Sequence, residues 1–357
     1  MTPFISGPTY REMLHPDTLP EAVRRQAAAA LSNELDPANL FNITWRGPDG
    51  AVRCVELPRE LTGIEANILV LERTETYKRD PHNKILAQFE LLPNYRFHRA
   101  VTGRSALEAA RGHGNRRIAA FVSAPGSAGT LAAGDEIKER FPDAVVCALE
   151  PKECSTLFNS GRGTHRIEGI GDKMVTLIHN VLTTDYVGLI HDDDCVMGLC
   201  LLERQRPHVE RMLGLPEGAW SGLAGLFGVS GICNVLGAIR MARFLHLGAG
   251  DNVVTIATDG FDRYPSVLAN LEERVGPLTD SLLDQWFQTI FREWSADEIL
   301  DVRPPEQKTR LFAAKEEVWT RFGYSKPYLE RMKSQSFWDA EFEKIHEIDP
   351  AVTKARG

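Results

Sequence analysis

The chain has 357 residues, of which 43% are apolar and 25% are charged, as in a globular protein with a proper core. Its net charge of −8 argues against a nucleic-acid partner, which would require a basic face. The six cysteines form no CxxC pair and favour reduced thiols over a disulfide framework or a zinc site, and the first residues lack the pattern of a signal peptide. We therefore expect a cytoplasmic protein without a metal.

Residues 1–60 are rich in Pro, Asn and Asp and predict an N-terminal extension with one short helix over 19–31. The apolar run ANILVL at 66–71 predicts a strand. The uncharged stretch 221–239 has almost the length of a membrane span, but its five glycines and its Ser and Asn residues favour a buried core segment in which a loop enters a helix. We expect no membrane contact.

From about residue 83 the sequence alternates between helix and strand patterns. The predicted elements are a helix over 102–112, a strand over 117–123, the loop PGSAGT at 125–130, a helix over 131–141, a strand over 144–149, a helix over 232–247 and a buried strand over 251–257. Strand, glycine-rich loop, helix and strand in succession form a right-handed βαβ unit, which predicts a parallel sheet.

The last 90 or so residues change character and predict amphipathic helices. They contain four of the six tryptophans, Trp286, Trp294, Trp319 and Trp338. Ser325 followed by Pro327 is a typical signal for the start of a helix. This region predicts a helical extension that serves packing or self-association.

The glycine-rich loop between the strand and the helix has the residue types of a phosphate site. Its members are Gly126, Ser127, Ala128, Gly129 and Thr130. Successive backbone N–H groups, two hydroxyls and the positive end of a helix can bind an anion, and small residues allow it to approach. The loop is neither a Walker A motif nor GxGxxG, so a tight turn for helix–strand packing is an equal alternative on this evidence alone.

The segments around this loop supply a family resemblance. They are QFE at 88–90 with Asn94 and His98, then SAPGSAGTLAAGDEIKERFPDAVVCALEP at 123–151, HRIEGIG at 165–171, GVSG at 228–231 and VVTIATDGFDRYPS at 253–266. In this order they resemble motifs of the cysteine synthases, which are pyridoxal-phosphate enzymes of fold type II. The resemblance is closest to a bacterial branch of cysteine-synthase-like proteins that depend on pyridoxal phosphate.

The resemblance implies a role for several residues. Residues 126–130 would hold the phosphate of pyridoxal 5'-phosphate, Gln88 would lie near the substrate carboxylate, and Gly169 and Gly171 would let the backbone approach the cofactor. Asp259 falls where the family has a Ser or Thr that faces the pyridine nitrogen, and a carboxylate there would favour a protonated nitrogen. The alternative for Asp259 is a turn residue before Gly260.

The family's catalytic lysine has no clear counterpart. Enzymes of this fold need a Schiff-base lysine, placed after the strand equivalent to 66–71 in a Ser-x-Lys or Ser-His-Lys setting. Here the chain continues as ERTETYKRDPHNKILAQFE, without that motif and without the family's Ser-Gly-Asn loop. Roughly 100 residues, most of the small domain, are missing, which exceeds ordinary loop variation. Lys78 is the candidate nearest the expected place, Lys84 is a weaker one, and a solvated helix face is the alternative for Lys78.

Other polar residues carry weaker hypotheses. The stretch HDDDC at 191–195 could bind a hard cation, although the resemblance places a helix start there, which we favour. His165 and His179 either line the cofactor cleft or are structural. Cys147 and Cys233 lie in apolar runs and are expected in the core.

We therefore predict an α/β, tryptophan synthase β-like protein of fold type II that retains the large domain, has a reduced small domain, and ends in a helical C-terminal extension. The predicted division is an extension over 1–60, the cofactor domain over 61–266 with its truncation near 72–86, and the helical extension over 267–357. The expected function is β-elimination or β-replacement on a small amino acid by a homodimeric lyase or transferase of amino-acid metabolism. The alternative is a non-catalytic relative, a pseudoenzyme that keeps the phosphate-binding fold, with or without another chain that supplies the missing domain.

Overall fold

The computed structural model describes residues 40–46, 52–58, 79, 87–161 and 163–347, and the chain divides into two compact units, Met1–Ala87 and Gln88–Gly357. In the first unit, β1 (Leu40–Arg46) pairs antiparallel with β2 (Val52–Pro58). This pair was not predicted, although apolar and polar residues alternate in LFNITWR as in a strand. The predicted helix over 19–31 and the predicted strand over 66–71 lie outside the described residues.

The second unit is built on a five-stranded sheet with the order β6-β3-β4-β5-β7. The strands are β3 (Ile118–Ser123), β4 (Val145–Pro151), β5 (Tyr186–Ile190), β6 (Asn252–Thr255) and β7 (Ile299–Asp301). The first four run parallel, and β7 is antiparallel to β5. β3 and β4 are joined through α6 (Ala133–Arg140), so the predicted βαβ unit is confirmed.

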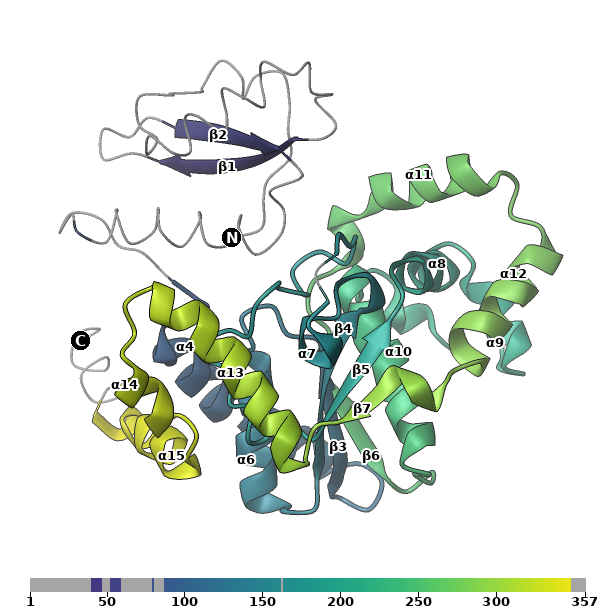
Figure 1. Cartoon of the computed structure of the whole chain (residues 1–357). Helices are drawn as coiled ribbons and strands as arrows, with labels where there is room; N and C mark the ends of the chain where they lie inside the picture. Colours follow the sequence, from purple (N-terminus) through teal and green to yellow (C-terminus); the bar gives the residue numbers. More distant parts are fainter. Residues whose placement is uncertain (1–39, 47–51, 59–78, 80–86, 162, 348–357) are drawn as a thin grey trace, which may run out of the picture. The chain divides into compact units, whose positions relative to one another are not determined.

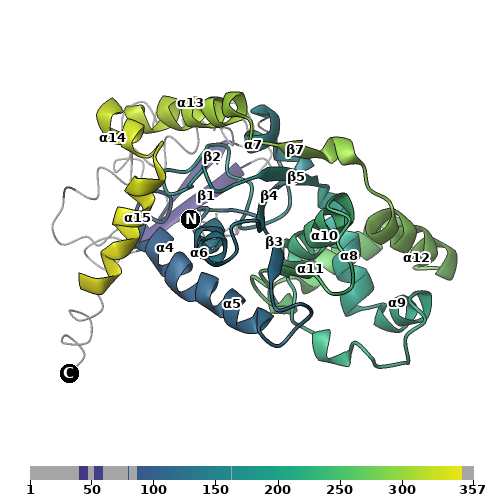
Figure 2. The same ribbon diagram turned by 90° about the horizontal axis from the view of Figure 1, so that it is seen from below.

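Helices cover both faces of this sheet (Figures 1 and 2). One side carries α8 (Asp192–Glu203), α9 (Arg206–Met212), α10 (Val229–Phe244), α11 (Pro265–Val275) and α12 (Asp280–Phe287). The other carries α4 (Leu92–Phe97), α5 (Arg104–Ala110), α6 and α13 (Pro305–Arg321). Two buried apolar clusters fill the spaces between the helices and the sheet, and Cys147 and Cys233 belong to the first of them, as predicted.

The remaining elements are short. They are α7 (Thr156–Asn159), α14 (Lys326–Arg331), α15 (Gln335–Glu343), π-helical turns over His98–Gly103 and Gln288–Arg292, and 3₁₀ turns over Thr130–Ala132, Lys152–Cys154, Ser221–Leu223, Phe261–Arg263 and Ala296–Glu298. The turn over His98–Gly103 joins α4 to α5, so the helix predicted from residue 102 begins ten residues earlier, at Leu92.

The structure corrects two predictions about strands. The strand expected over 251–257 was predicted to be buried, but β6 is half-buried because it is the last strand of the sheet and pairs only with β3. The region beyond residue 266 was predicted to be helical, yet β7 adds an antiparallel strand to the sheet. The compact unit runs on to Gly357. The domain boundaries after residues 60 and 266 stay predictions.

The C-terminal helices pack within this unit. The Ser325 hydroxyl accepts the backbone N–H of Tyr328 at the start of α14, which confirms the predicted helix start. Trp286, Trp319 and Trp338 are buried, in line with a packing role. The stretch 221–239 is a loop that enters α10, as predicted, but only its helical part is buried: residues 221–227 are mostly exposed, which corrects the expected core segment. Within the described part of the chain, no helix has the length and apolar character that a bilayer crossing requires.

Two lysines of α13, the buried Lys315 and the half-buried Lys308, hold the segment 175–184. This segment contacts the glycine-rich loop, because the Thr176 hydroxyl donates to the Ser127 carbonyl at 2.8 Å. The Lys315 Nζ atom donates to the carbonyl oxygens of Leu177 and His179 at 3.1 and 2.5 Å. Burial lowers the pKa of Lys315 to about 7. Lys308 donates to the carbonyls of Val181, Leu182 and Thr184, and burial lowers its pKa to about 8.

The lowered pKa of Lys315 predicts a pH dependence of stability. Between pH 7 and the unfolded-state pKa of 10.5, the folded chain binds fewer protons than the unfolded chain, so the free energy of unfolding rises with pH. We expect the wild type to gain about 1–2 kcal/mol between pH 7 and pH 9 relative to Lys315→Met, as measured by urea unfolding. The exposed-site variant Lys326→Met should keep the wild-type slope, and equal slopes in Lys315→Met and the wild type would contradict the buried amine.

Candidate cofactor-binding site

The site is centred on the loop after β3, which ends where the 3₁₀ turn over Thr130–Ala132 leads into α6. Ala128 has a φ of +68°, in the left-handed region, and Gly129 that follows is right-handed, at φ −55° and ψ −47°. A left-handed residue next to a right-handed one turns successive N–H groups toward the same point, which is the geometry of an anion-binding nest. A non-glycine residue in this region is strained, as is common at functional sites.

The N–H groups of this loop are available to a ligand. Within the described residues, the backbone N–H groups of Gly126, Ser127, Ala128 and Thr130 have no acceptor, and that of Gly129 makes only a long 3.3 Å bond to the Ser127 Oγ atom. Unpaired N–H groups around one turn fit a phosphate, which brings several strong acceptors. The unpaired N–H groups of the loop therefore fit the phosphate of a cofactor.

Two hydroxyls of the loop are placed by neighbouring side chains. The Ser127 Oγ atom accepts the Asn94 Nδ2 group at 2.9 Å, so its own hydrogen can turn toward an anion. The Thr130 and Ser123 hydroxyls share a hydrogen bond of 2.9 Å. The Asn94 Nδ2 group also donates to the carbonyl of Gln88 at 3.0 Å, which places Gln88 beside the loop. Asn94 belongs to the family motif, but its role as a support for Ser127 was missed.

Both glycines of the loop lie where a Cβ atom would collide. A Cβ on Gly126 would lie 2.4 Å from the carbonyl oxygen of Gly169, and one on Gly129 would lie 2.5 Å from the Asn94 Oδ1 atom. The Gly171 N–H donates to the carbonyl of Pro125 at 3.2 Å. The structure therefore brings the segment around Gly169 and Gly171 against the phosphate loop, and both of these glycines have left-handed φ values, +82° and +72°.

A small pocket adjoins the loop. Its wall includes Gly126, Ala128, Glu150, Asp172, Thr176 and His179. Burial raises the pKa of Glu150 to about 8, although its carboxylate accepts the N–H groups of Leu157 and Phe158, and burial raises the pKa of Asp172 to about 7. The raised pKa values weaken the repulsion between these carboxyl groups and an anion in the neighbouring loop, because a smaller fraction of each group is ionised at pH 7.

The two histidines behave differently from each other. His179 lines the pocket, is buried and shares a 2.8 Å hydrogen bond with the Thr184 hydroxyl, which agrees with the structural role considered for it. Its role in a cofactor cleft stays a prediction. Burial lowers the pKa of His179 well below the usual value. The His165 Nε2 atom is 3.1 Å from the carbonyl oxygen of Gly171, while its Nδ1 atom is buried without a partner. His165 thus supports the backbone of the Gly171 segment.

Asp259 lies beyond the carboxyl end of β6, which is parallel to β3 and beside it. Its carboxylate accepts the Tyr264 hydroxyl at 2.7 Å, and its carbonyl accepts the Gly228 N–H at 2.6 Å. Burial, together with this carboxylate, raises the pKa of Tyr264. Asp259 is therefore part of a hydrogen-bonded turn at the edge of the sheet that also carries the phosphate loop.

Two predicted features stand apart from this site. Lys78 and Lys84 lie outside the described residues, and no described lysine lines the pocket. The HDDDC stretch starts α8, as expected, with its three aspartates paired to arginines. Among the residues that the structure describes, no group of three potential ligands could hold a metal ion.

The second unit is an open α/β fold whose glycine-rich loop lies at the carboxyl edge of a mostly parallel sheet, and this is the edge at which open α/β folds bind their ligands. No protein-family model matches the chain. It is 27% identical over 180 residues to the cysteine synthase of Staphylococcus aureus strain Mu50, which covers 50% of this chain and 51% of that protein. It is also 27% identical over 234 residues to cysteine synthase B of Campylobacter jejuni, which covers 65% of this chain and 62% of that protein.

Among solved structures, O-acetyl serine sulfhydrylase isoform 3 from Entamoeba histolytica is similar with a TM-score of 0.49 and 23% identity, over 63% of this chain and 59% of that one. The chain is therefore similar to the cysteine synthases over half of its length or more, in line with the resemblance to pyridoxal-phosphate proteins of fold type II and with the tryptophan synthase β-like fold predicted from its sequence. It spans about half the length of the S. aureus relative that it matches.

Proposed function

We propose that the chain binds pyridoxal 5'-phosphate through residues 126–130 and acts as an enzyme of the cysteine synthase type, in β-elimination or β-replacement on a small amino acid. The observation that carries the proposal is the loop with its unpaired backbone N–H groups and its left-handed to right-handed reversal at Ala128 and Gly129. The relationship to cysteine synthases supports the identity of the cofactor. A cytoplasmic homodimer is the form expected from that relationship.

This proposal assigns a role to each residue of the site. The loop N–H groups and the Ser127 hydroxyl bind the phosphate, and Asn94 keeps that hydroxyl in place. Gly169 and Gly171 keep their backbone close to the cofactor, Gln88 lies beside the substrate carboxylate, and Asp259 faces the pyridine nitrogen. When bound, the cofactor supplies an electron-poor ring that stabilises negative charge on the α-carbon of an amino acid.

The second candidate function is that of a pseudoenzyme, and it is supported by the absence of a recognisable Schiff-base lysine from the described site. The sequence between residues 71 and 88 lacks the Ser-x-Lys motif, and no described lysine lines the pocket. In this case the chain is a pseudoenzyme that binds the cofactor, or only a phosphate, without turnover. In the enzyme, Lys78 is the residue that carries the cofactor and moves the α-proton.

One experiment separates these candidates. The purified chain is incubated with pyridoxal phosphate, reduced with borohydride and digested, and the labelled lysine is identified by mass spectrometry. Labelling at Lys78 that is lost in Lys78→Arg supports the enzyme, with Lys84→Arg as the control. Saturable binding without labelling supports the pseudoenzyme, and the absence of binding rejects both.

The pairing proposed for Asp259 has its own test. A carboxylate beside the pyridine nitrogen stabilises the protonated ring, so Asp259→Asn should shift the absorbance titration of the bound cofactor to lower pH by roughly one unit or more. The exposed neighbour Asp262 provides the control variant, Asp262→Asn, which should titrate as the wild type does. An unchanged titration in Asp259→Asn would leave Asp259 as a turn residue only.

A further inference from the structure

The segment 165–171 has no helix or strand of its own and lies against the loop 126–130. It contacts the loop through the Gly171 N–H bond to Pro125 and through the Gly169 carbonyl, which faces Gly126. Within the segment, His165 supports the Gly171 carbonyl. These contacts fix only the ends of the segment, so its position also depends on the contacts of the residues between them.

Helix α8 supplies that support through its first residue. Asp192 is only 4% exposed, and its Oδ2 atom accepts the backbone N–H of Arg166 at 2.6 Å. The same oxygen lies 3.6 Å from the Arg166 Nε atom. A carboxylate bond to a backbone N–H is charge-assisted and stronger than a neutral one.

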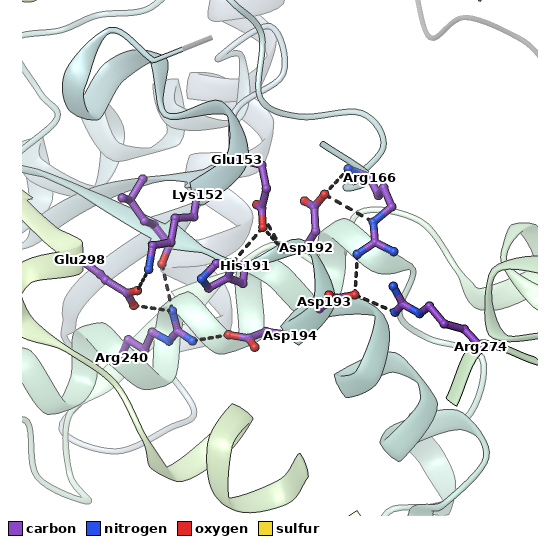
Figure 3. A network of polar contacts seen from close by, with 11 residues as sticks. Lys152, Glu153, Arg166, His191, Asp192, Asp193, Asp194, Arg240, Arg274 and Glu298 are labelled. Carbon is purple, nitrogen blue, oxygen red and sulfur yellow. Dashed lines mark hydrogen bonds and ion pairs between the residues drawn. The ribbon is translucent and has the colours of Figure 1, made fainter. Parts of the chain in front are cut away.

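The surrounding charges hold Asp192 itself in place (Figure 3). The Glu153 carboxylate accepts the Asp192 N–H at 3.3 Å and shares a 2.8 Å hydrogen bond with the His191 Nδ1 atom. Asp193 pairs with the side chain of Arg166 at 2.5 Å and with Arg274 at 2.8 Å. Asp193 thus binds the side chain of Arg166, whereas Asp192 binds its backbone.

Three further ion pairs complete the network on its other side. Asp194 pairs with Arg240 at 2.8 Å, and Arg240 also contacts Glu298 at 3.2 Å. Lys152 reaches the same Glu298 carboxylate at 2.8 Å. None of these three contacts touches the segment 165–171.

We propose that Asp192 is a positioning residue for the cofactor: it anchors the backbone of Arg166 and thereby holds the segment 165–171 against the phosphate loop. The inference rests on the proposed binding of pyridoxal phosphate. It assigns to the acidic start of α8 a task other than the cation binding considered from the sequence.

The environment of Asp192 makes a specific rescue possible. Its Oδ1 atom is buried without a partner, and burial together with the neighbouring Glu153 raises the pKa of Asp192 to about 6. The site therefore tolerates a neutral side chain. An asparagine keeps an oxygen for the Arg166 N–H and replaces the unpaired oxygen with an amide that can donate to Glu153.

The test compares three variants in two measurements, the dissociation constant for pyridoxal phosphate and the hydrogen exchange of the amides in 165–171, with urea unfolding as the check on folding. Asp192→Ala should weaken binding about tenfold and accelerate exchange of the Arg166 amide by a similar factor, because a charge-assisted bond is lost. Asp192→Asn should stay within about threefold of the wild type in both. Asp193→Asn, which leaves the backbone bond in place, should behave like Asp192→Asn.

The wild type provides a measurement that does not depend on any variant. Because coupling is reciprocal, saturating pyridoxal phosphate should slow exchange of the amides in 165–171. No such protection, or an Asp192→Ala variant with unchanged affinity, would overturn this inference while the proposed function stands. A wild type that binds no pyridoxal phosphate would overturn both.

Discussion

Gly126→Ala should bind pyridoxal phosphate at least about tenfold more weakly than the wild type and unfold about 1–3 kcal/mol more easily. The new Cβ atom would lie 2.4 Å from the carbonyl oxygen of Gly169, a backbone atom that cannot rotate away. The loop and the segment 165–171 must then separate, which moves the N–H groups that face the anion. Titration of the absorbance of the cofactor and urea unfolding measure the two effects.

Gly222→Ala is the matched control for this variant. A Cβ on Gly222 meets nothing within 4 Å, and its backbone is not left-handed. At such a site alanine is neutral or slightly stabilising, by about 0.4–1 kcal/mol, because it restricts the unfolded chain. Equal cofactor affinities in Gly126→Ala and Gly222→Ala would show that the contact between the loop and the segment 165–171 does not shape the site.

Asn234→Ala should lower the free energy of unfolding by about 2–4 kcal/mol and weaken cofactor binding as well. Asn234 lies on α10, has 0% exposure, accepts the Ala124 N–H at 2.7 Å and donates to the Ile256 carbonyl at 2.8 Å. Its loss leaves both backbone groups without a partner at the carboxyl ends of β3 and β6. Because Ala124 directly precedes the phosphate loop, the variant also loses the hydrogen bond that anchors the start of the loop.

A similar amide at the opposite end of the same strands gives the control. The Asn252 Nδ2 group donates to the carbonyls of His113 and Arg117 at 3.1 and 2.8 Å, but both bonds are exposed, so water can replace them. Asn252→Ala should cost less than about 1 kcal/mol and leave cofactor binding unchanged. A larger loss in Asn252→Ala than in Asn234→Ala would contradict this explanation.

The parts of the site that could be predicted from the sequence are those carried by local patterns. A buried strand, a run of small residues and a helix in immediate succession predicted the anion loop, because these residue types leave the backbone N–H groups accessible. The family resemblance implied that Gly169 and Gly171 let the backbone approach the cofactor, and the structure adds that both lie beside that loop. Gln88 and Asn94 belong to one motif, but the hydrogen bond between them is known only from the structure.

The parts that could not be predicted depend on pairing between distant residues. The three-residue strand β7 owes its conformation to β5, more than 100 residues earlier in the chain, and its own sequence is too short to show a period. The bond between Asp192 and the Arg166 N–H joins a helix start to an irregular segment, and neither sequence specifies the other. In the sequence, Asn234 is a single polar residue on an apolar helix, and its role becomes clear only from the two strand ends that it connects in the structure.

The central claim is that residues 126–130 form a phosphate cradle, and a crystal of the chain soaked in pyridoxal phosphate tests it most directly. We expect the phosphate oxygens to lie within hydrogen-bond distance of the N–H groups of Gly126, Ser127, Ala128 and Thr130, with the Ser127 hydroxyl turned toward them. A cofactor bound elsewhere, or a turn filled by side chains with no anion in it, would contradict the claim and leave the relationship to cysteine synthases as one of fold alone.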